Sequence, residues 1–458
     1  MSGPSVSIQL QDGTISALQR DGIITARGVP YASANRFEPP RPRGKWDGVL
    51  DCTRPGPICP QPKSRLDALN RPVARGRAMS EDCLRVSVFA PAPIIRTDEL
   101  LPTMVWIHGG NYTTGAGDLD CYSGAGLATK GVVVINVTYR LGILGYQPIK
   151  GRVPTNLGLM DQIAALKWVQ DNAGFFGGDA GRVCLFGQSA GGDSVYTLLG
   201  ANGTEGLFHR AIIQSAPLGV RLTETQEMLA ALESAADELV PRDHADVPVE
   251  HLLAIQDTIV AKSFGYAAAD MAFAPRPNHD PLPDEETFLK QLDCAIRRVP
   301  IFIGYTRDEG TAFVPLFNHI DASKRPHFEG PLPEFIGKAW FQDQAKQLYR
   351  QIRQSEPREE PWFYVFEISP SQSPWGAAHT VDLPFILGDW EAWKQAPMMH
   401  GEGIEEMVQS VGDEVKKLWV AFAKGEGVGR REFVRRQVRG GSEVGFVELC
   451  TIVLARPR

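Results

Sequence analysis

Short apolar runs recur along the chain, and longer segments with helical spacing of apolar residues separate them. Five of these runs are rich in β-branched or aromatic residues, at 104–107, 132–137, 183–186, 301–303 and 362–366. Apolar residues that do not alternate with polar ones are typical of strands buried on both faces. We therefore predict a central sheet built from these runs.

Segment 157–172 shows the helical pattern most clearly. Leu159, Ile163, Leu166 and Val169 follow one another at intervals of four, three and three residues, which places them on one helix face. Strands that alternate with helices predict an α/β fold, with a central, mostly parallel sheet flanked by helices on both sides. Ligand sites in such sheets lie beyond the carboxyl ends of the strands.

Composition and charge narrow the class of protein. The chain has 458 residues, 43% hydrophobic and 22% charged, which is typical of a folded globular protein. Its 47 Lys and Arg against 54 Asp and Glu give a net charge of −7, without the basic excess that nucleic-acid binding needs. Seven cysteines with no C-x-x-C pair and no Cys/His cluster predict no metal site.

The N-terminus carries neither the basic region nor the apolar run of a signal peptide, so we expect a cytoplasmic protein. The apolar stretch 131–137 is far shorter than the ~20 residues that cross a bilayer. We therefore expect no membrane span.

The strongest local signal is Gly187-Gln188-Ser189-Ala190-Gly191, which lies between the run 183–186 and a predicted helix at 192–199. This is a G-x-S-x-G motif in the strand-turn-helix context that gives it meaning. A sharp turn here projects the Ser189 hydroxyl above the sheet, and side chains at the flanking glycines would collide with the neighbouring strand or helix. The motif predicts that Ser189 is a nucleophile and that the Ala190 amide faces the same site.

A second motif follows the run 104–107, as His108-Gly109-Gly110-Asn111. A glycine pair after a strand lets backbone N–H groups approach a developing oxyanion without a Cβ in the way. A simple tight turn would use the same residues.

Taken together, these motifs resemble the type-B carboxylesterase/lipase family, the cholinesterase-like branch of the α/β-hydrolases. The resemblance extends from about residue 28 to about residue 425. Further matching segments are GVPYA (28–32), GPICPQ (56–61), SEDCL (80–84), NVTYRLG (136–142), NLGLMDQ (156–162), FGGD (176–179) and QSA (214–216). It implies an α/β-hydrolase fold in one catalytic domain over 1–458, with a divergent tail at 426–458.

The resemblance also implies the remaining catalytic residues. The family's acid motif is matched by GYTRDEG (304–310), where the acid corresponds to Glu309 and not Asp308. Its histidine motif is matched by GAAHTVDLPF (376–385), which points to His379. The chain order Ser, acid, His is that of α/β-hydrolases. His108 could be proposed as the base, but the family pattern puts it in the oxyanion loop.

By the same comparison, the oxyanion donors are the backbone N–H groups of Gly110, Asn111 and Ala190. Asn111 stands where the family often has a third glycine, and Gln188 where it usually has Glu. Both departures affect the expected substrate range more than the expected activity.

Cys59 and Cys83 match the family's first disulfide. Such a bridge would argue mildly for secretion, whereas the missing export signal argues for reduced thiols. The sequence leaves this open.

The implied activity is that of a serine carboxylic-ester hydrolase acting through an acyl-enzyme on Ser189, without cofactor or metal. An acyltransferase or a lactone-opening enzyme would use the same residues. A non-catalytic binding protein of the same fold would typically lack the nucleophile. The oligomeric state is not predicted.

The expected substrate is a small-molecule ester. Residues 60–82, which border the active site in the family, contain no aromatic side chain here, so a cation–π platform is missing from that loop. The loop carries five Lys and Arg against three Asp and Glu. This pattern favours neutral or acidic substrates over cationic ones, although the charges could equally keep a surface loop solvated.

Overall fold

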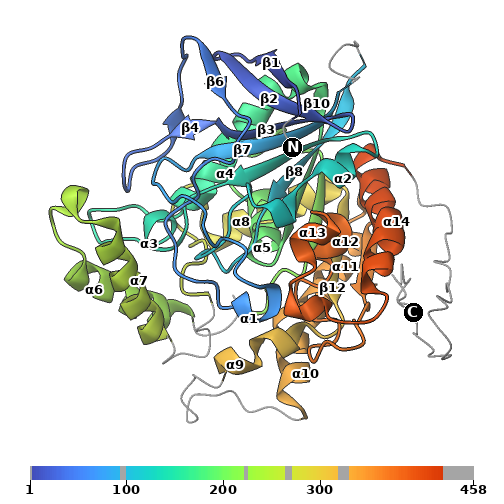
Figure 1. The fold of residues 1–458 in the computed structure, drawn as a ribbon. Helices are drawn as coiled ribbons and strands as arrows, with labels where there is room; N and C mark the ends of the chain where they lie inside the picture. Colours follow the sequence, from blue (N-terminus) through green and yellow to red (C-terminus); the bar gives the residue numbers. More distant parts are fainter. Residues whose placement is uncertain (1–2, 93–98, 221–224, 264–270, 318–329, 427–458) are drawn as a thin grey trace.

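The computed structural model describes residues 3–92, 99–220, 225–263, 271–317 and 330–426. A single large sheet runs through them in the order β1-β2-β3-β7-β9-β8-β10-β11-β12-β13, with β6 beside β2 (Figure 1). Its strands are β1 (Ser5–Gln9), β2 (Thr14–Arg20), β3 (Ile23–Pro30), β6 (Val49–Asp51), β7 (Arg85–Pro91), β8 (Leu101–Ile107), β9 (Val133–Thr138), β10 (Gly178–Gln188), β11 (Arg210–Gln214), β12 (Ile301–Thr306) and β13 (Trp362–Phe366). A separate pair is formed by β4 (Ala32–Ser33) and β5 (Arg41–Pro42).

Strands β9, β8, β10, β11, β12 and β13 run parallel to one another. Strands β1, β2, β3 and β7 are antiparallel to their neighbours in the sheet order, as is β7 to β9. The five predicted runs all fall on parallel strands. The antiparallel strands were not predicted. In β2 one face is less buried, so its buried positions alternate with more exposed ones and form no continuous apolar run.

The helices are α1 (Asp67–Asn70), α2 (Ala125–Ala128), α3 (Gly142–Gly145), α4 (Leu157–Asn172), α5 (Ala190–Leu199), α6 (Thr225–Leu239), α7 (Val249–Ser263), α8 (Glu285–Arg298), α9 (Val314–Phe317), α10 (Leu332–Ile336), α11 (Asp343–Gln354), α12 (Leu383–Ile386), α13 (Trp390–Trp393) and α14 (Ile404–Lys424). Short 3₁₀ turns include η2 (Asp120–Tyr122), η3 (Ala173–Phe176), η5 (His244–Asp246), η7 (Glu309–Phe313) and η10 (Pro397–Met399), and η9 (Gly337–Gln342) is a π-helical turn. The helix predicted at 157–172 is α4. Helix α5 begins at Ala190, two residues before the predicted start.

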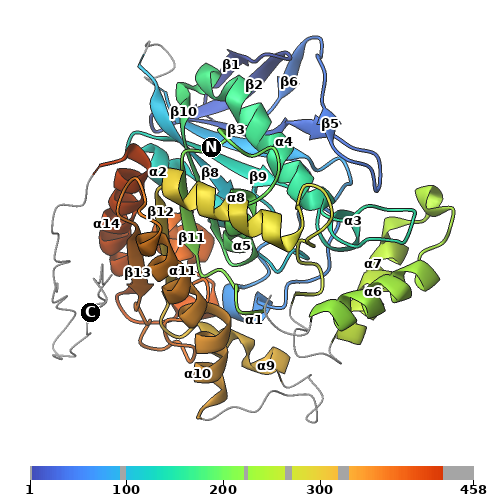
Figure 2. The same ribbon diagram turned by 180° about the vertical axis from the view of Figure 1, so that it is seen from behind.

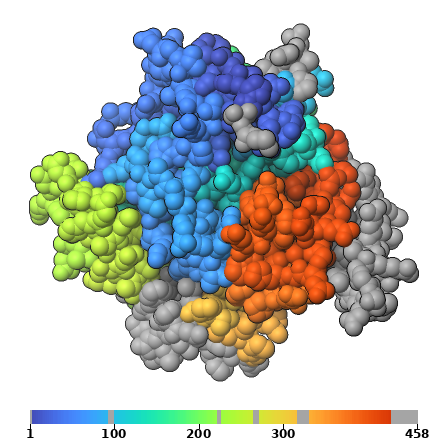
Figure 3. All heavy atoms as spheres, viewed as in Figure 1, coloured from blue at the N-terminus to red at the C-terminus, as the bar shows by residue number. Residues whose placement is uncertain are grey.

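Helices cover both faces of the sheet. Helices α12, α13 and α14 lie in front of it in Figure 1, whereas α4 and α8 come to the front when the molecule is turned (Figure 2). The predicted α/β-hydrolase architecture, a mostly parallel sheet with helices on both sides, is confirmed. Helices α6 and α7 lie side by side and project from one edge, as the space-filling view also shows (Figure 3).

Aromatic side chains fasten α14 to β12, which precedes Glu309, and to β13, which follows it in the chain. The Phe302 ring of β12 lies 4.9 Å from Trp419 and 5.5 Å from Phe422 of α14. Tyr364 of β13 lies 5.2 Å from Trp419. These side chains are almost completely buried, so β12 enters the site from a rigid core.

No helix among the described residues has the length and apolar character to cross a bilayer. In the same part of the chain, no group of three or more His, Cys, Asp or Glu side chains could hold a metal ion. The predicted single domain includes the divergent tail at 426–458, of which 427–458 lie outside the described residues.

Candidate active site

Ser189 occupies a strained turn between β10 and α5. Its backbone angles are φ 59° and ψ −127°, and a non-glycine residue seldom adopts positive φ. The turn is held by the Ser189 amide, which donates to the Gln214 carbonyl at 2.9 Å, and by the Ser189 carbonyl, which accepts from the Asp193 amide at 2.9 Å. Such strain persists only where the surroundings impose it, and it is common at functional sites.

The flanking glycines are required by close contacts, as the motif predicts. A Cβ on Gly187 would lie 2.4 Å from the Gly191 carbonyl oxygen of α5. A Cβ on Gly191 would lie 2.0 Å from the Ile107 carbonyl oxygen of β8. The turn therefore packs directly against the strand that leads into the oxyanion loop.

Glu309 and His379 meet in the interior. Glu309 begins η7 directly after β12, and its Oε1 accepts a hydrogen bond from the Thr306 amide at 2.8 Å. Its Oε2 is hydrogen-bonded to Nδ1 of His379, and both side chains are fully buried. Since a carboxylate only accepts, Nδ1 carries a proton, and in the neutral imidazole Nε2 then keeps a lone pair.

The loops that carry these two residues are joined by their backbones. The Asp308 amide donates to the Ala377 carbonyl at 2.9 Å, and the Ala377 amide donates to Oδ2 of Asp308 at 2.8 Å. Asp308 therefore ties the two loops together, whereas Glu309 reaches the imidazole. This division agrees with the choice of Glu309 over Asp308.

The imidazole of His379 is enclosed by two phenylalanine rings and one amide. The ring centroids of Phe313 and Phe341 lie 4.9 Å and 5.0 Å from that of His379. Its Nε2 lies 3.2 Å from Nε2 of Gln188, the residue before Ser189. Within the described residues, no hydrogen bond joins the imidazole to the Ser189 hydroxyl. The structure thus brings His379 to Glu309 and to the serine turn, but not into a hydrogen bond with Ser189 itself.

The oxyanion loop lies against the serine turn. A Cβ on Gly109 would be 2.9 Å from Cβ of Ser189. Gly110, Asn111 and Tyr112 all have positive φ, at 111°, 58° and 58°.

The loop leaves its predicted donors free. Among the described residues, the amides of Gly110, Asn111 and Ala190 find no hydrogen-bond acceptor. Three unused backbone donors near one hydroxyl are the arrangement that an oxyanion hole requires.

His108 is part of this loop and supports it. Its Nδ1 lies 2.8 Å from the Gly109 carbonyl oxygen, and its ring stacks on Tyr139 with centroids 4.4 Å apart. Burial lowers the pKa of the His108 imidazole to about 4. The side chain is therefore neutral at pH 7 and fully enclosed, a position that fits a supporting residue and not a general base.

Asp382 is a second buried carboxyl close to the candidate triad. Burial is the main cause that raises the pKa of Asp382 to about 6, and the negative charge of Glu309 adds to it. Its Oδ2 accepts from Nε2 of Gln214 at 3.2 Å and from the Tyr364 hydroxyl at 3.4 Å. Asp382 belongs to the histidine motif, but the sequence alone predicts no role for it. A lone acidic residue in the apolar run 381–386 was the available signal.

Ser189 lines a small cavity of about 40 Å³. The other lining residues are Ser64, Arg65, Leu66, Gly110, Asn111, Thr113, Thr114, Pro217, Met271, Phe313 and Phe341. Oxyanion-loop residues and the two rings that contact His379 therefore face one space with the serine. Arg65 is the one charged residue in this lining.

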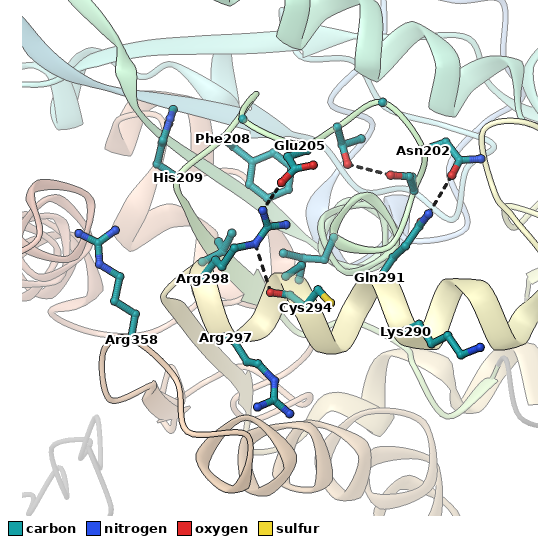
Figure 4. Close-up of a pocket in the computed structure, with 17 residues that line it drawn as sticks. Asn202, Glu205, Phe208, His209, Lys290, Gln291, Cys294, Arg297, Arg298 and Arg358 are labelled. Carbon is teal, nitrogen blue, oxygen red and sulfur yellow. Dashed lines mark hydrogen bonds and ion pairs between the residues drawn. The ribbon is translucent and has the colours of Figure 1, made fainter.

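A larger hollow of about 930 Å³ lies elsewhere, between segment 199–209 and α8, and holds none of the predicted site residues (Figure 4). The Lys and Arg side chains that line it pair with neighbouring carboxylates or do not converge on one point. Arg298 pairs with Glu205, and Arg297 pairs with Asp293 of its own helix. We assign it no part in the chemistry.

The disulfide that the family resemblance left possible is not formed in this structure, where Cys59 and Cys83 are both free thiols. The hydrogen bond that the Cys83 thiol donates to Cys59, together with burial, raises the pKa of Cys83 well above its usual value. Sγ of Cys59 also accepts from the Leu141 amide at 3.3 Å. The two sulfurs are neighbours that pack as thiols in the core.

Comparisons with known proteins agree with this geometry. Residues 5–329 match the model of the carboxylesterase family. The para-nitrobenzyl esterase of Bacillus subtilis (strain 168) is 32% identical, with 91% of this chain and 89% of that protein covered. A protein of Rhodococcus erythropolis named "Probable N-octanoylanthranilate hydrolase AqdA2" is 35% identical, with 86% and 87% covered.

Solved structures give the same result. A thermophilic para-nitrobenzyl esterase matches with a TM-score of 0.75 and 30% identity, over 93% of this chain and 92% of that one. These matches confirm the predicted resemblance and the predicted ester-hydrolase activity. The chain belongs to the carboxylesterase family.

Proposed function

We propose that this carboxylic ester hydrolase works through an acyl-enzyme on Ser189, with His379 as general base and Glu309 as its acidic partner. The observation that carries the proposal is the buried hydrogen bond between Glu309 and His379, which leaves a lone pair on Nε2 beside the serine turn. Neither a metal nor a cofactor enters the reaction as proposed.

In the first half-reaction, Nε2 of His379 takes the Ser189 proton as Oγ attacks the ester carbonyl carbon. The carbonyl oxygen becomes negatively charged, and the unused amides of Gly110, Asn111 and Ala190 stabilise it. Glu309 stabilises the imidazolium, which then gives its proton to the departing alcohol.

In the second half-reaction, water attacks the acyl-enzyme carbonyl carbon and gives its proton to His379. Breakdown of this second intermediate releases the carboxylic acid and restores the Ser189 hydroxyl, which recovers its proton from the imidazolium.

An organophosphorus serine probe followed by peptide mapping tests this mechanism. We expect one labelled peptide containing Ser189 and no label in Ser189→Ala. A matched control is Ser64→Ala, which removes another hydroxyl that lines the same cavity and should leave labelling intact. Labelling at another serine, or full esterase activity in Ser189→Ala, would contradict the proposal.

We further propose that the site prefers neutral or acidic esters over cationic ones. Arg65 lines the cavity beside Ser189, so a cationic substrate group would approach a like charge. Two other cations of the 60–82 loop hold the fold together: Arg71 donates to the Ala392 carbonyl at 2.8 Å, and Arg77 to the Gly56 carbonyl at 3.0 Å. The similar hydrolase named for N-octanoylanthranilate is named for a substrate that carries a carboxylate.

Three esters of one acyl group test this preference: a choline ester, a neutral alkyl ester and an ester whose alcohol bears a carboxylate. We expect kcat/KM for the choline ester to be lowest, and Arg65→Gln to narrow its deficit by about threefold to tenfold. Lys63→Gln is the control, because Lys63 belongs to the same loop but not to the cavity lining. A choline ester that outperforms the neutral ester would refute the charge preference.

A further inference from the structure

The Gln188 side chain lies at the nitrogen that must accept the Ser189 proton. Its Nε2 is 3.2 Å from Nε2 of His379, and the exposed fractions of the two side chains are 2% and 0%. Glu309 engages the Nδ1 side of the imidazole, so in the neutral ring, the form that acts as a base, Nε2 has only a lone pair to offer. An amide nitrogen can only donate, hence Gln188 N–H fills that lone pair.

One lone pair cannot serve two donors well. Within the described residues the imidazole is hydrogen-bonded to Glu309 and Gln188, and the Ser189 hydroxyl takes no share in this network. Proton transfer from Ser189 to Nε2 therefore requires that the amide give way or that the ring move.

The ring is the less mobile of the two partners. Glu309, itself held by the Thr306 amide, fixes the Nδ1 edge. Phe313 and Phe341 lie against the imidazole with centroid distances of 4.9 Å and 5.0 Å. Any rotation of the ring would break the Glu309 bond and push against both aromatic rings.

The Gln188 backbone is also fixed, so its side chain must move. Gln188 is the last residue of β10 and pairs with Gln214 of β11. A Cβ on Gly109 would lie 2.5 Å from the Gln188 carbonyl oxygen, which shows how closely the oxyanion loop presses on this backbone. The amide group, at the end of three rotatable bonds, can turn while the backbone stays in place.

We propose that Gln188 is a positioning residue that occupies Nε2 of His379 in the free enzyme and yields it to the Ser189 hydroxyl when an ester enters. Nε2 exchanges the Gln188 N–H for the Ser189 hydroxyl as its hydrogen-bond donor and then takes the hydroxyl proton. The step needs no further proton donor or acceptor. This inference rests on the triad proposed above. It adds a residue that acts through the base without touching the substrate.

Gln188 also keeps this position uncharged. A carboxylate here would attract the imidazolium and would have no N–H to offer the lone pair. The other ionisable groups around the imidazole are Glu309, Asp382 with the Tyr364 hydroxyl on it, and Asp308 on the adjoining loop. The pKa of Asp382, about 6, lies in the range of a histidine. A measurement of activity against pH therefore needs a variant in which Asp382 cannot ionise.

The experiment compares wild type with Gln188→Met, which has similar length but no N–H, and with Gln188→Glu. Two readouts are the rate of Ser189 labelling by the organophosphorus probe at pH 8 and the pH of half-maximal kcat/KM on the acid side for a neutral ester. Each variant is also made with Asp382→Asn. Thermal unfolding checks that each variant is folded.

We expect Gln188→Met to be labelled about threefold to tenfold faster than wild type at pH 8, because a competing hydrogen bond is gone. Its acid-side half-maximum should move to higher pH by about half a unit, since an N–H that favours the unprotonated base is lost. Gln188→Glu should move it further, by about one unit or more. Both displacements should persist with Asp382→Asn.

Unchanged or slower labelling of Gln188→Met, with its acid side where wild type has it, would overturn the inference and leave Gln188 a packing residue. If Gln188→Met does not fold, Gln188→Glu decides instead. A pH of half-maximal kcat/KM equal to that of wild type would then overturn the inference. Failure of the proposed mechanism looks different, because wild type itself would then not be labelled at Ser189.

Discussion

At the residue scale, two neighbouring carboxylates do different work. Glu309 is fully buried and hydrogen-bonded to His379, whereas Asp308 is partly exposed, pairs with Arg307 and holds the Ala377 amide. The motif that contains both was predicted from sequence, and the assignment of the acid came from the family resemblance. The structure supplies the physical distinction, since only one carboxylate reaches the imidazole.

Glu309→Gln should therefore lower kcat/KM by about 10³-fold to 10⁴-fold, because an amide cannot stabilise the imidazolium as a carboxylate does. Asp308→Asn should cost less than about tenfold, since an amide oxygen can still accept from Ala377. Steady-state hydrolysis of a neutral nitrophenyl ester measures both. The reverse order of losses would make Asp308 the acid.

At the element scale, a buried ion pair joins the end of β9 to α4. The guanidinium of Arg140 donates from Nε and NH2 to the two oxygens of Asp161, at 2.8 Å and 2.7 Å. A third donor reaches the Glu38 carbonyl at 2.7 Å, and the two side chains are 4% and 0% exposed. Asp161 lies on α4, a helix that its apolar face predicted. Its buried polar residues could not be foreseen, because they face partners brought in from remote segments.

Asp161→Asn should lower the free energy of unfolding by about 3–5 kcal/mol, since it leaves the Arg140 charge buried without its counter-charge. The matched control is Asp413→Asn, which removes the same carboxylate charge from the more exposed pair with Lys130 and should cost no more than about 1 kcal/mol. Urea unfolding at pH 7 compares the two. Equal losses would show that the Arg140 pair contributes no more than a surface pair.

At the scale of the whole molecule, two buried groups give stability opposite dependences on pH. The pKa of Asp382 rises from 3.8 to about 6 on folding, so the folded state binds its proton more tightly and loses stability as pH rises through that window. The pKa of His108 falls from 6.5 to about 4, so the unfolded state binds that proton more tightly and stability is lost as pH falls through the window. The two contributions largely offset each other.

Asp382→Asn should expose the contribution of His108. The quantity of interest is the free energy of unfolding of the variant minus that of wild type. This difference should be about 3 kcal/mol larger at pH 7 than at pH 4, because a pKa shift of about two units is removed. Urea unfolding at several pH values measures this difference. A difference that does not change with pH would mean that Asp382 ionises in the folded protein as it does in the unfolded chain.

Local pattern in the sequence was sufficient for much of this protein. Continuous apolar runs identified five parallel strands, because a strand that is buried on both faces has apolar side chains at consecutive positions. The glycines around Ser189 and at 109–110 marked two tightly packed turns, since only glycine tolerates those contacts. The motifs matched to the family placed Glu309 and His379 in chain order.

Tertiary structure decided what depends on distance between remote segments. The sulfurs of Cys59 and Cys83 lie side by side without a bond, and Gln188, not Ser189, is hydrogen-bonded to the imidazole. The raised pKa of Asp382 likewise depends on burial and on Glu309. A hydrogen bond or a pKa reflects ångström-scale separation and local burial, and spacing along the chain specifies neither until the sheet has brought the segments together.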